Sequence, residues 1–145
     1  MTRAVRHVGI VVRKIDDVLP FYRDLLGFRM MKRTDEPEEF VSRLLGMRTC
    51  RLVTVKLSAD EGKTLIELLE FVSSPVDPTG SPGLDGMGIS HIALTVNDLN
   101  RVYRKLSRAG TPFISLPLTS PDGKAKVAFC RDPAGTWLEL VEELA

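Results

Sequence analysis

The sequence predicts an α+β fold built from two tandem copies of a βαβββ module. Two observations support this: an internal repeat, and strand-like and helix-like runs that follow the same order in both halves. The 145 residues and 16.1 kDa fit a single domain. Hydrophobic residues make up 43% and charged residues 27%, which is enough apolar surface for a packed core.

Two segments of the first half recur in the second half. HVGIVVRKIDDV, which starts at residue 7, aligns with HIALTVNDLNRV, which starts at residue 91, at an offset of 84. LIELLE, from residue 65, aligns with WLELVE, from residue 137, at an offset of 72. The repeat therefore matches the histidines and the interior glutamates of the two halves, His7 with His91 and Glu67 with Glu139.

The first half contains one strand, one helix and three further strands. Residues 6–12 are rich in β-branched side chains, as is typical of a buried strand. Apolar residues at helical spacing predict a helix over 16–26, with Pro20 near its first turn and Gly27 at its end. Extended segments are expected at 28–32, 51–57 and 64–72, with a hairpin turn at 60–62.

The second half repeats this order. The expected elements are a strand at 89–96, a helix at 98–109 ended by Gly110, a short strand near Phe113, and strands at 124–130 and 136–143 joined by a turn at 132–135. The first half has 12 additional residues between its histidine and its glutamate. We assign them to residues 35–47 and expect a short helix or lid there.

The domain organisation follows from the repeat. We expect one domain over 1–145, with module 1 at about 5–72, a Pro, Gly and Ser-rich linker at 73–88 and module 2 at about 89–145. Neither module is large enough to be stable alone.

The composition argues against several classes of protein. A net charge of +1 without a basic run argues against nucleic acid as a partner. No apolar stretch reaches the length of a membrane span and the N-terminus lacks a signal-peptide pattern, so we expect a cytoplasmic protein that binds no membrane. Cys50 and Cys130 lie in strand-like runs without CxxC spacing, which predicts buried thiols.

The repeated polar residues indicate a metal site. Each module places a histidine near the start of its first strand and a glutamate inside its last strand, among apolar residues. Burying an unpaired carboxylate is unfavourable, so the glutamates are expected on a concave, half-buried face. Two imidazoles and two carboxylates that converge there would bind a divalent metal and leave positions for water and substrate. A single histidine in a strand is usually a hydrogen-bonded core residue, but that alternative does not explain why both pairs recur.

These motifs resemble the vicinal oxygen chelate superfamily, which includes glyoxalase I, methylmalonyl-CoA epimerase, bleomycin-resistance proteins and extradiol dioxygenases. The resemblance rests on HVGIVVRKIDDVLPFYRDLLGF, TLIELLEF, GISHIALTVNDL and KVAFCRDPAGTWLELVEEL and covers almost the whole chain. It implies an open, curved, mixed sheet around a metal site and, commonly, a homodimer. By position it implies the metal ligands His7, Glu67, His91 and Glu139.

The resemblance also implies an activity. Dioxygenases and fosfomycin-resistance enzymes typically have histidine at the position of Glu67, so the ligand set favours glyoxalase I and the epimerase. We therefore expect a divalent-metal-dependent isomerase, epimerase or lyase that stabilises an enediolate or enolate next to a metal-bound carbonyl of a small carbonyl or thioester substrate. Nickel, zinc, cobalt and manganese suit the ligands better than iron.

Several assignments remain alternatives. Glu139 or Glu67 is the expected catalytic base, with Glu36, Glu38 and Glu39 in the insertion as other candidates. Strand parity and the resemblance place six side chains in the substrate pocket: Val11, Leu69, Ala93, Lys126, Phe129 and Trp137. Glyoxalase I has glutathione-binding arginine and asparagine at the positions of Val11 and Phe71, which argues against glutathione here. The competing functions are a ligand-sequestering binding protein of the resistance type and an extradiol dioxygenase.

Overall fold

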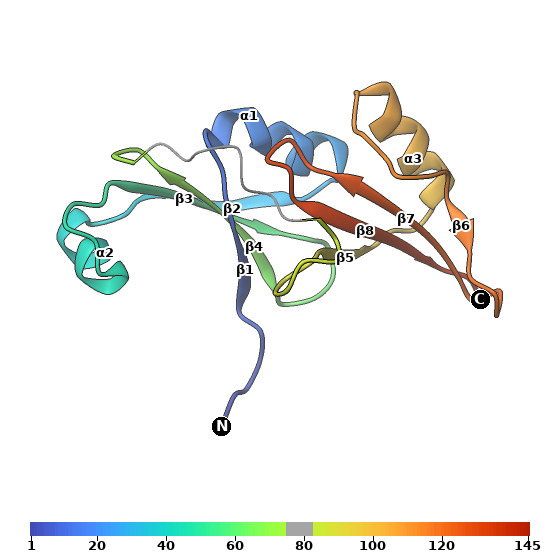
Figure 1. Ribbon diagram of the computed structural model, residues 1–145, viewed down its shortest axis with the longest axis horizontal. Coiled ribbons are helices and arrows are strands. Elements are labelled where there is room, and N and C mark those ends of the chain that lie inside the picture. Colours follow the sequence, from blue (N-terminus) through green and yellow to red (C-terminus); the bar gives the residue numbers. More distant parts are fainter. Residues whose placement is uncertain (75–82) are drawn as a thin grey trace. The chain divides into compact units, whose positions relative to one another are not determined.

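The computed structural model describes residues 1–74 and 83–145. Of the predicted linker at 73–88, residues 75–82 lie outside the described part of the chain. The chain divides into two compact units, Met1–Thr79 and Gly80–Ala145 (Figure 1). The first contains β1 (His7–Val11), α1 (Ile15–Pro20), η1 (Phe21–Leu25), β2 (Arg29–Asp35), α2 (Glu38–Leu45), β3 (Leu52–Ser58) and β4 (Leu65–Phe71). The second contains β5 (Ile92–Thr95), α3 (Leu99–Arg108), β6 (Leu118–Thr119), β7 (Ala125–Arg131) and β8 (Trp137–Glu143).

Both units have the same sheet topology. Each forms a four-stranded mixed sheet, with strand order β1-β4-β3-β2 in the first and β5-β8-β7-β6 in the second. The first strand of each unit pairs in parallel with the last strand, and the other pairs are antiparallel. Gly9 is opposite Glu67 and Ala93 is opposite Glu139, so the strand register repeats with the offsets seen in the sequence. The α+β prediction of two βαβββ modules is confirmed.

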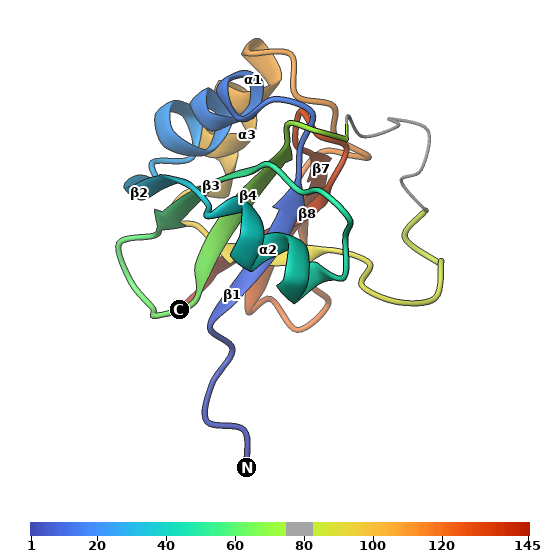
Figure 2. The same ribbon diagram turned by 90° about the vertical axis from the view of Figure 1, so that its left-hand side faces the viewer.

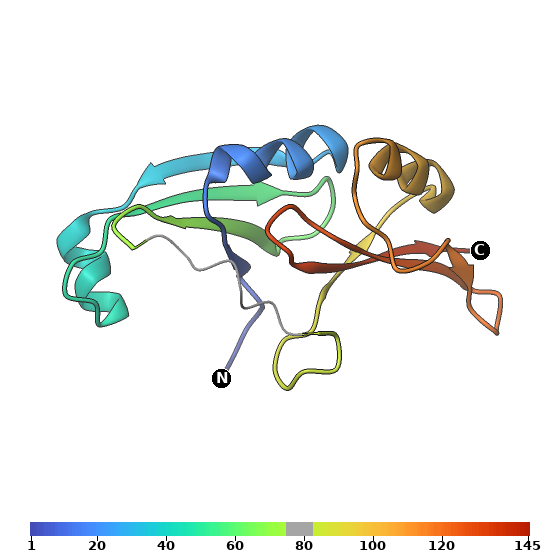
Figure 3. The same ribbon diagram turned by 45° about the horizontal axis from the view of Figure 1, so that its top comes forward.

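Each sheet buries one face under a helix. In the first unit, α1 lies along one side of the sheet, and α2 lies at the end of β2 and β3 (Figure 3). Ile66, Leu68 and Leu57 are buried on the face covered by α1, together with Ile15 from that helix. In the second unit, Leu138 and Leu140 of β8 are fully buried, as are residues of α3. The predicted insertion at 35–47 contains the helix α2, as expected (Figure 2).

A glutamate from the last strand of each sheet binds the N-terminus of the helix that covers the sheet. Glu70 Oε2 accepts a hydrogen bond of 2.8 Å from the backbone N–H of Ile15, the first residue of α1. Glu142 Oε2 accepts one of 3.0 Å from Leu99, the first residue of α3. These carboxylates satisfy amide groups that have no partner within the helix and lie at its positive end. Glu70 and Glu142 are thus on the helix-covered face of their sheets, opposite to the face of Glu67 and Glu139.

Replacing Glu70 by alanine is expected to lower the free energy of unfolding by about 1 kcal/mol, because the Ile15 amide loses its acceptor. Urea unfolding followed by circular dichroism measures this. Glu61→Ala is the control, since Glu61 is exposed in the connection between β3 and β4. Equal stability of the Glu70→Ala variant and the wild type would contradict this role.

The first helix differs from the prediction at Pro20. Pro20 is the last residue of α1 and lacks the N–H that would continue the α-helical bonds, and the next turn, η1, is π-helical. There the amide of Leu26 donates to Phe21 O, five residues earlier. The helix still ends at Gly27, as predicted, because its φ of 82° is in the left-handed region that favours glycine.

Two strand predictions in the second half need correction. The strand expected at 89–96 is only Ile92–Thr95, and Ile89 is exposed. The short strand expected near Phe113 is a single bridge between Phe113 and Cys130. The strand that completes the second sheet at its edge is instead β6 at Leu118–Thr119. A two-residue edge strand is held by backbone pairing to β7 and has too few side chains for a recognisable pattern.

Both cysteines are free and buried, which confirms the prediction of buried thiols. Burial raises the pKa of the Cys130 thiol to about 12, and the charge of Asp132 adds to the shift. In the part of the chain that the structure describes, no helix has the length and apolar character needed to cross a membrane.

In native protein at pH 8, Cys130 is expected not to react with a disulfide reagent, because its thiolate is disfavoured and its side chain is inaccessible. Its contribution to stability is complete below the ordinary thiol pKa of 9.0 and is lost as the pH rises towards about 12. Thiol counting before and after unfolding in guanidinium measures the reactivity. Rapid modification of Cys130 in folded protein at pH 8 would contradict this expectation.

Candidate metal centre

The second module brings its predicted ligands into contact. His91 directly precedes β5, and Glu139 is in the middle of β8, the parallel neighbour of β5. His91 Nε2 is 3.0 Å from Glu139 Oε2. The side chains are 32% and 25% exposed, so the pair is half-buried and open to a small ligand.

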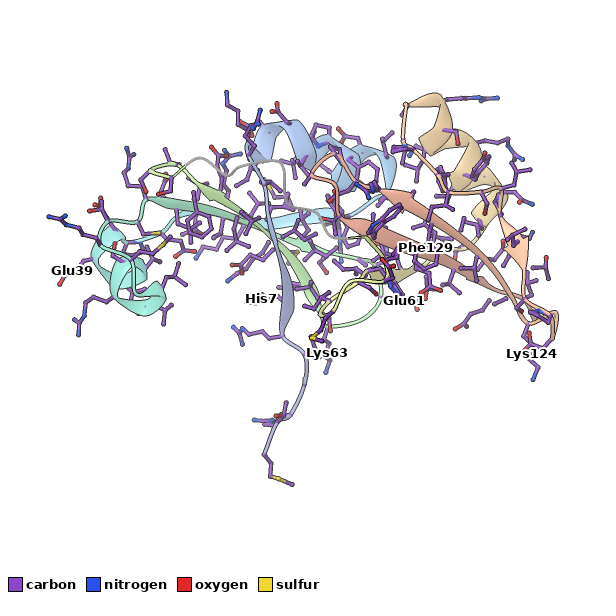
Figure 4. All side chains as sticks on the ribbon, in the orientation of Figure 1. His7, Glu39, Glu61, Lys63, Lys124 and Phe129 are labelled. Atoms are coloured by element: carbon purple, nitrogen blue, oxygen red, sulfur yellow. The ribbon has the colours of Figure 1, made fainter. Side chains whose placement is uncertain are left out.

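Two neighbours hold the His91 ring. Ser90 Oγ is 2.7 Å from Nδ1, and a hydroxyl serves as donor or acceptor, so it pairs with Nδ1 in either tautomer. Phe129 of β7, labelled in Figure 4, packs edge-on against the imidazole. The two ring centroids are 5.1 Å apart. Such support orients an imidazole for metal binding through its other nitrogen.

The first module holds the equivalent pair. His7 is the first residue of β1 (Figure 4). Its Nδ1 is 3.7 Å from Glu67 Oε2 on β4. Glu67 is only 9% exposed, which makes it one of the few buried charged residues of the described chain. Gly9 and Ala93 lie opposite Glu67 and Glu139, and a Cβ atom at Gly9 would lie 3.1 Å from Leu69 Cδ1, so a larger residue there would crowd Leu69.

Lys56 is a neighbour of Glu67 that the sequence analysis missed. It is opposite Glu67 in the antiparallel register of β3 and β4, and its Nζ is 3.9 Å from Glu67 Oε2. The register follows from the length of the connection between the two strands, whereas counting back from the turn predicted at 60–62 would have placed Val55 opposite Glu67, one residue out of register.

The donor atoms fit a divalent metal. Two ligand atoms bound to one ion at about 2.1 Å, with tetrahedral or octahedral angles, are about 3.0–3.4 Å apart. The His91–Glu139 distance of 3.0 Å lies in this range, and the His7–Glu67 distance of 3.7 Å is slightly longer. Neutral imidazole and carboxylate are ligands that nickel, zinc, cobalt and manganese accept.

The structure describes the two pairs each within its own unit. Among residues 1–74 and 83–145, no three or more histidine, cysteine, aspartate or glutamate side chains are grouped as ligands of one ion. The four-ligand site that the resemblance implies therefore stays a prediction.

Five of the six predicted pocket residues share a sheet face with the ligands. Val11 is on the His7 face of β1, Leu69 on the Glu67 face of β4, and Ala93, Phe129 and Trp137 on the Glu139 face of the second sheet. Leu69 packs against the small core of Val41, Cys50 and Leu52 beneath α2. Arg131 lies 4.1 Å above the ring of Trp137, which places a cation beside this aromatic side chain.

Lys126 is the exception. It is opposite Glu142 in the register of β7 and β8, and its Nζ is 3.9 Å from Glu142 Oε2. Because alternate residues of a strand point to opposite faces, Lys126 is on the helix-covered face and not on the face of Glu139. The assignment of Lys126 to the pocket is therefore corrected.

The three glutamates of the insertion differ in their surroundings. Glu36 Oε1 accepts a hydrogen bond of 2.7 Å from Thr54, a buried residue on the Glu67 face of the sheet. Glu38 and Glu39 are exposed in the first turn of α2, and Glu39 points away from the sheet (Figure 4). Of the three, only Glu36 has a contact with the face that holds Glu67.

A duplicated βαβββ unit with a His–Glu pair on each sheet defines the class of this protein. The family model described as Glyoxalase/Bleomycin resistance protein/Dioxygenase superfamily matches residues 4–140. The chain belongs to this superfamily.

Relatives that the alignment covers over most of their length support the assignment. The chain is 27% identical over 138 residues to a probable lactoylglutathione lyase of Synechocystis, covering 94% of this chain and 92% of the relative. It is 29% identical over 145 residues to a lactoylglutathione lyase of Pseudomonas aeruginosa, covering 94% and 80%. The YwbC protein of Bacillus subtilis is 25% identical over 143 residues, covering 98% and 99%.

Solved structures share the fold. A glyoxalase family protein from Bacillus cereus superposes with a TM-score of 0.87 at 22% identity, covering 99% of this chain and 97% of that one. The trypanothione-dependent glyoxalase I of Leishmania major superposes with a TM-score of 0.70 at 23% identity, covering 98% and 88%.

Proposed function

We propose that this chain is a divalent-metal-dependent enzyme of the glyoxalase type, a lyase or an isomerase or epimerase, that moves a proton next to a carbonyl group of a small substrate. The observation that carries the proposal is the His–Glu pair at equivalent positions of both modules, with donor atoms 3.0 and 3.7 Å apart. Membership of the superfamily and relatives named lactoylglutathione lyase support it.

The metal ligands of this proposal are His7, Glu67, His91 and Glu139, and they hold one ion per chain. Nickel, zinc, cobalt and manganese are the candidates, since imidazole and carboxylate suit all four. The bound ion supplies Lewis-acid stabilisation of negative charge on a carbonyl oxygen. The protein residues position the substrate and move the proton.

Glu139 is the proposed proton carrier. Its side chain is 25% exposed, whereas that of Glu67 is 11% exposed and has both His7 and Lys56 near its Oε2. A carboxylate that takes a proton from one carbon and returns it to another must reach the substrate, so the more accessible glutamate suits this role. Glu67 has the complementary role of a fixed ligand.

The substrate is proposed to lack glutathione. The resemblance places Val11 and Phe71 where glyoxalase I has an arginine and an asparagine for that tripeptide. Val11 offers no hydrogen bond, and Phe71 packs against the core beneath α2. A small carbonyl compound or thioester therefore fits the proposal better.

Proton exchange next to a carbonyl tests this function. Metal-loaded protein in deuterium oxide is mixed with a panel of small 2-oxo compounds, their hemithioacetals and acyl thioesters, and NMR follows loss of the adjacent proton signal. We expect exchange with at least one substrate that stops after the metal is removed by a chelator and returns on reconstitution. Exchange with none of them, or exchange that does not depend on metal, would contradict the proposal.

The proposal includes a homodimer in the cytoplasm. Each described sheet has edge strands, whose free backbone groups favour pairing with a second copy. Two free, buried thiols suit a reducing compartment. Light scattering is expected to give twice the chain mass of 16.1 kDa, and a monomer at micromolar concentration would contradict the dimer.

A further inference from the structure

A row of side chains crosses the ligand face of the first sheet beside Glu67. Lys32 of β2 is opposite Lys56 of β3, Lys56 is opposite Glu67 of β4, and Glu67 is opposite Gly9 of β1. Residues opposite each other in a sheet point to the same face. Two lysines therefore lie on the side of Glu67 away from β1, and Lys56 is the nearer.

Lys56 keeps its hydrogen-bonding capacity. Its Nζ is 3.9 Å from Glu67 Oε2, which is an ion-pair distance and longer than a hydrogen bond. Within the described part of the chain, the structure gives this ammonium no hydrogen bond. Its side chain is 36% exposed, so a small ligand can reach it.

The second module shows that the glutamate position does not require a lysine. Phe129 is opposite Glu139 in the register of β7 and β8, as Lys56 is opposite Glu67. Within the described residues, the His91–Glu139 pair forms beside this aromatic ring, and Glu139 has no ion pair with a lysine. A role for Lys56 beyond balancing the charge of a buried glutamate is therefore favoured.

The net charge of the proposed metal site indicates the role of Lys56. Two carboxylates and one divalent ion sum to zero, so the metal site of the proposed function is neutral, and Lys56 adds one positive charge beside it. An ammonium near a neutral, half-buried site attracts a monoanion and is screened less than one in open water.

We propose that Lys56 is a specificity-determining residue that binds a carboxylate group of the substrate near the metal-bound end. This inference rests on the proposed function. It narrows the substrate class to carbonyl compounds that carry a free carboxylate, such as 2-oxo acids and acyl thioesters with a second carboxyl group. Their neutral esters are poor ligands.

A pair of probes that differ by one charge tests the inference. Cobalt(II)-loaded protein is titrated with pyruvate and with methyl pyruvate, and the visible spectrum of the cobalt reports binding. Lys56→Met removes the charge, Lys56→Arg keeps it, and Lys63→Met is the matched control because Lys63 is exposed in the connection between β3 and β4 (Figure 4). Circular dichroism and cobalt content verify that each variant is folded and loaded.

The wild type is expected to bind pyruvate about tenfold more tightly than methyl pyruvate. Lys56→Met should remove this preference by weakening pyruvate alone, Lys56→Arg should retain part of it, and Lys63→Met should equal the wild type. A full preference in loaded Lys56→Met, or none in the loaded wild type, would overturn the role of Lys56 and leave the metal site standing. A wild type that takes up no cobalt would overturn both proposals.

Discussion

Replacing Glu139 by glutamine is expected to lower the turnover of metal-loaded protein by about 10²–10⁴-fold, with the fold intact. An amide cannot accept the transferred proton and is a weaker metal ligand than a carboxylate. Glu139 is half-buried on a sheet face and takes no part in the helix-covered core, so the substitution leaves the packing unchanged. The measurement is kcat in the proton-exchange assay, together with the metal content of the variant.

Glu143→Gln is the matched control for this prediction. Glu143 is on the same strand and the same face as Glu139, four residues further along, and it is exposed. Its substitution removes an equal charge without touching the His91 pair, and activity should stay within about twofold of the wild type. Full activity of Glu139→Gln would show that Glu139 is not the proton carrier.

Replacing Leu140 by alanine is expected to lower the free energy of unfolding by about 2–5 kcal/mol. Leu140 is fully buried on β8, between its neighbours β5 and β7 and under α3. Removing its branched end loses burial energy and leaves a cavity in a closely packed core. Urea unfolding gives the change in midpoint and slope.

Leu118→Ala provides the comparison for the core variant. Leu118 is on the edge strand β6 and is 63% exposed, so the same chemical change should cost less than about 0.5 kcal/mol. Similar losses of stability in the two variants would contradict the assignment of the core to the helix-covered face of the second sheet.

The candidate ligands could be predicted from sequence because the repeat carries the register with it. Once HVGIVV and HIALTV are aligned, a parallel pairing of the first and last strands brings each histidine to its glutamate. The same repeat aligned Glu70 with Glu142. It gave no indication that they bind helix N-termini, because that contact depends on where the helix begins relative to the sheet.

Other features depend on pairings that a side-chain pattern does not encode. Lys56 meets Glu67 through the exact length of the β3–β4 connection. Lys126 is a different case, because it is three residues before Phe129 on β7 and strand parity alone places these two side chains on opposite faces. β6 is recognisable only by its backbone pairing with β7. The turn after Pro20 is π-helical because its backbone hydrogen bond joins residues five apart, one more than in an α-helix.

Metal content is the most direct test of the central claim that the two repeated His–Glu pairs hold one divalent ion. Untagged wild-type protein and a His7→Ala, His91→Ala double variant are purified in parallel, reconstituted with nickel, zinc, cobalt or manganese, dialysed and analysed for bound metal. We expect about one ion per chain in the wild type and almost none in the folded double variant. A wild type that retains no metal under any of these conditions, or a double variant that retains as much as the wild type, would contradict the account.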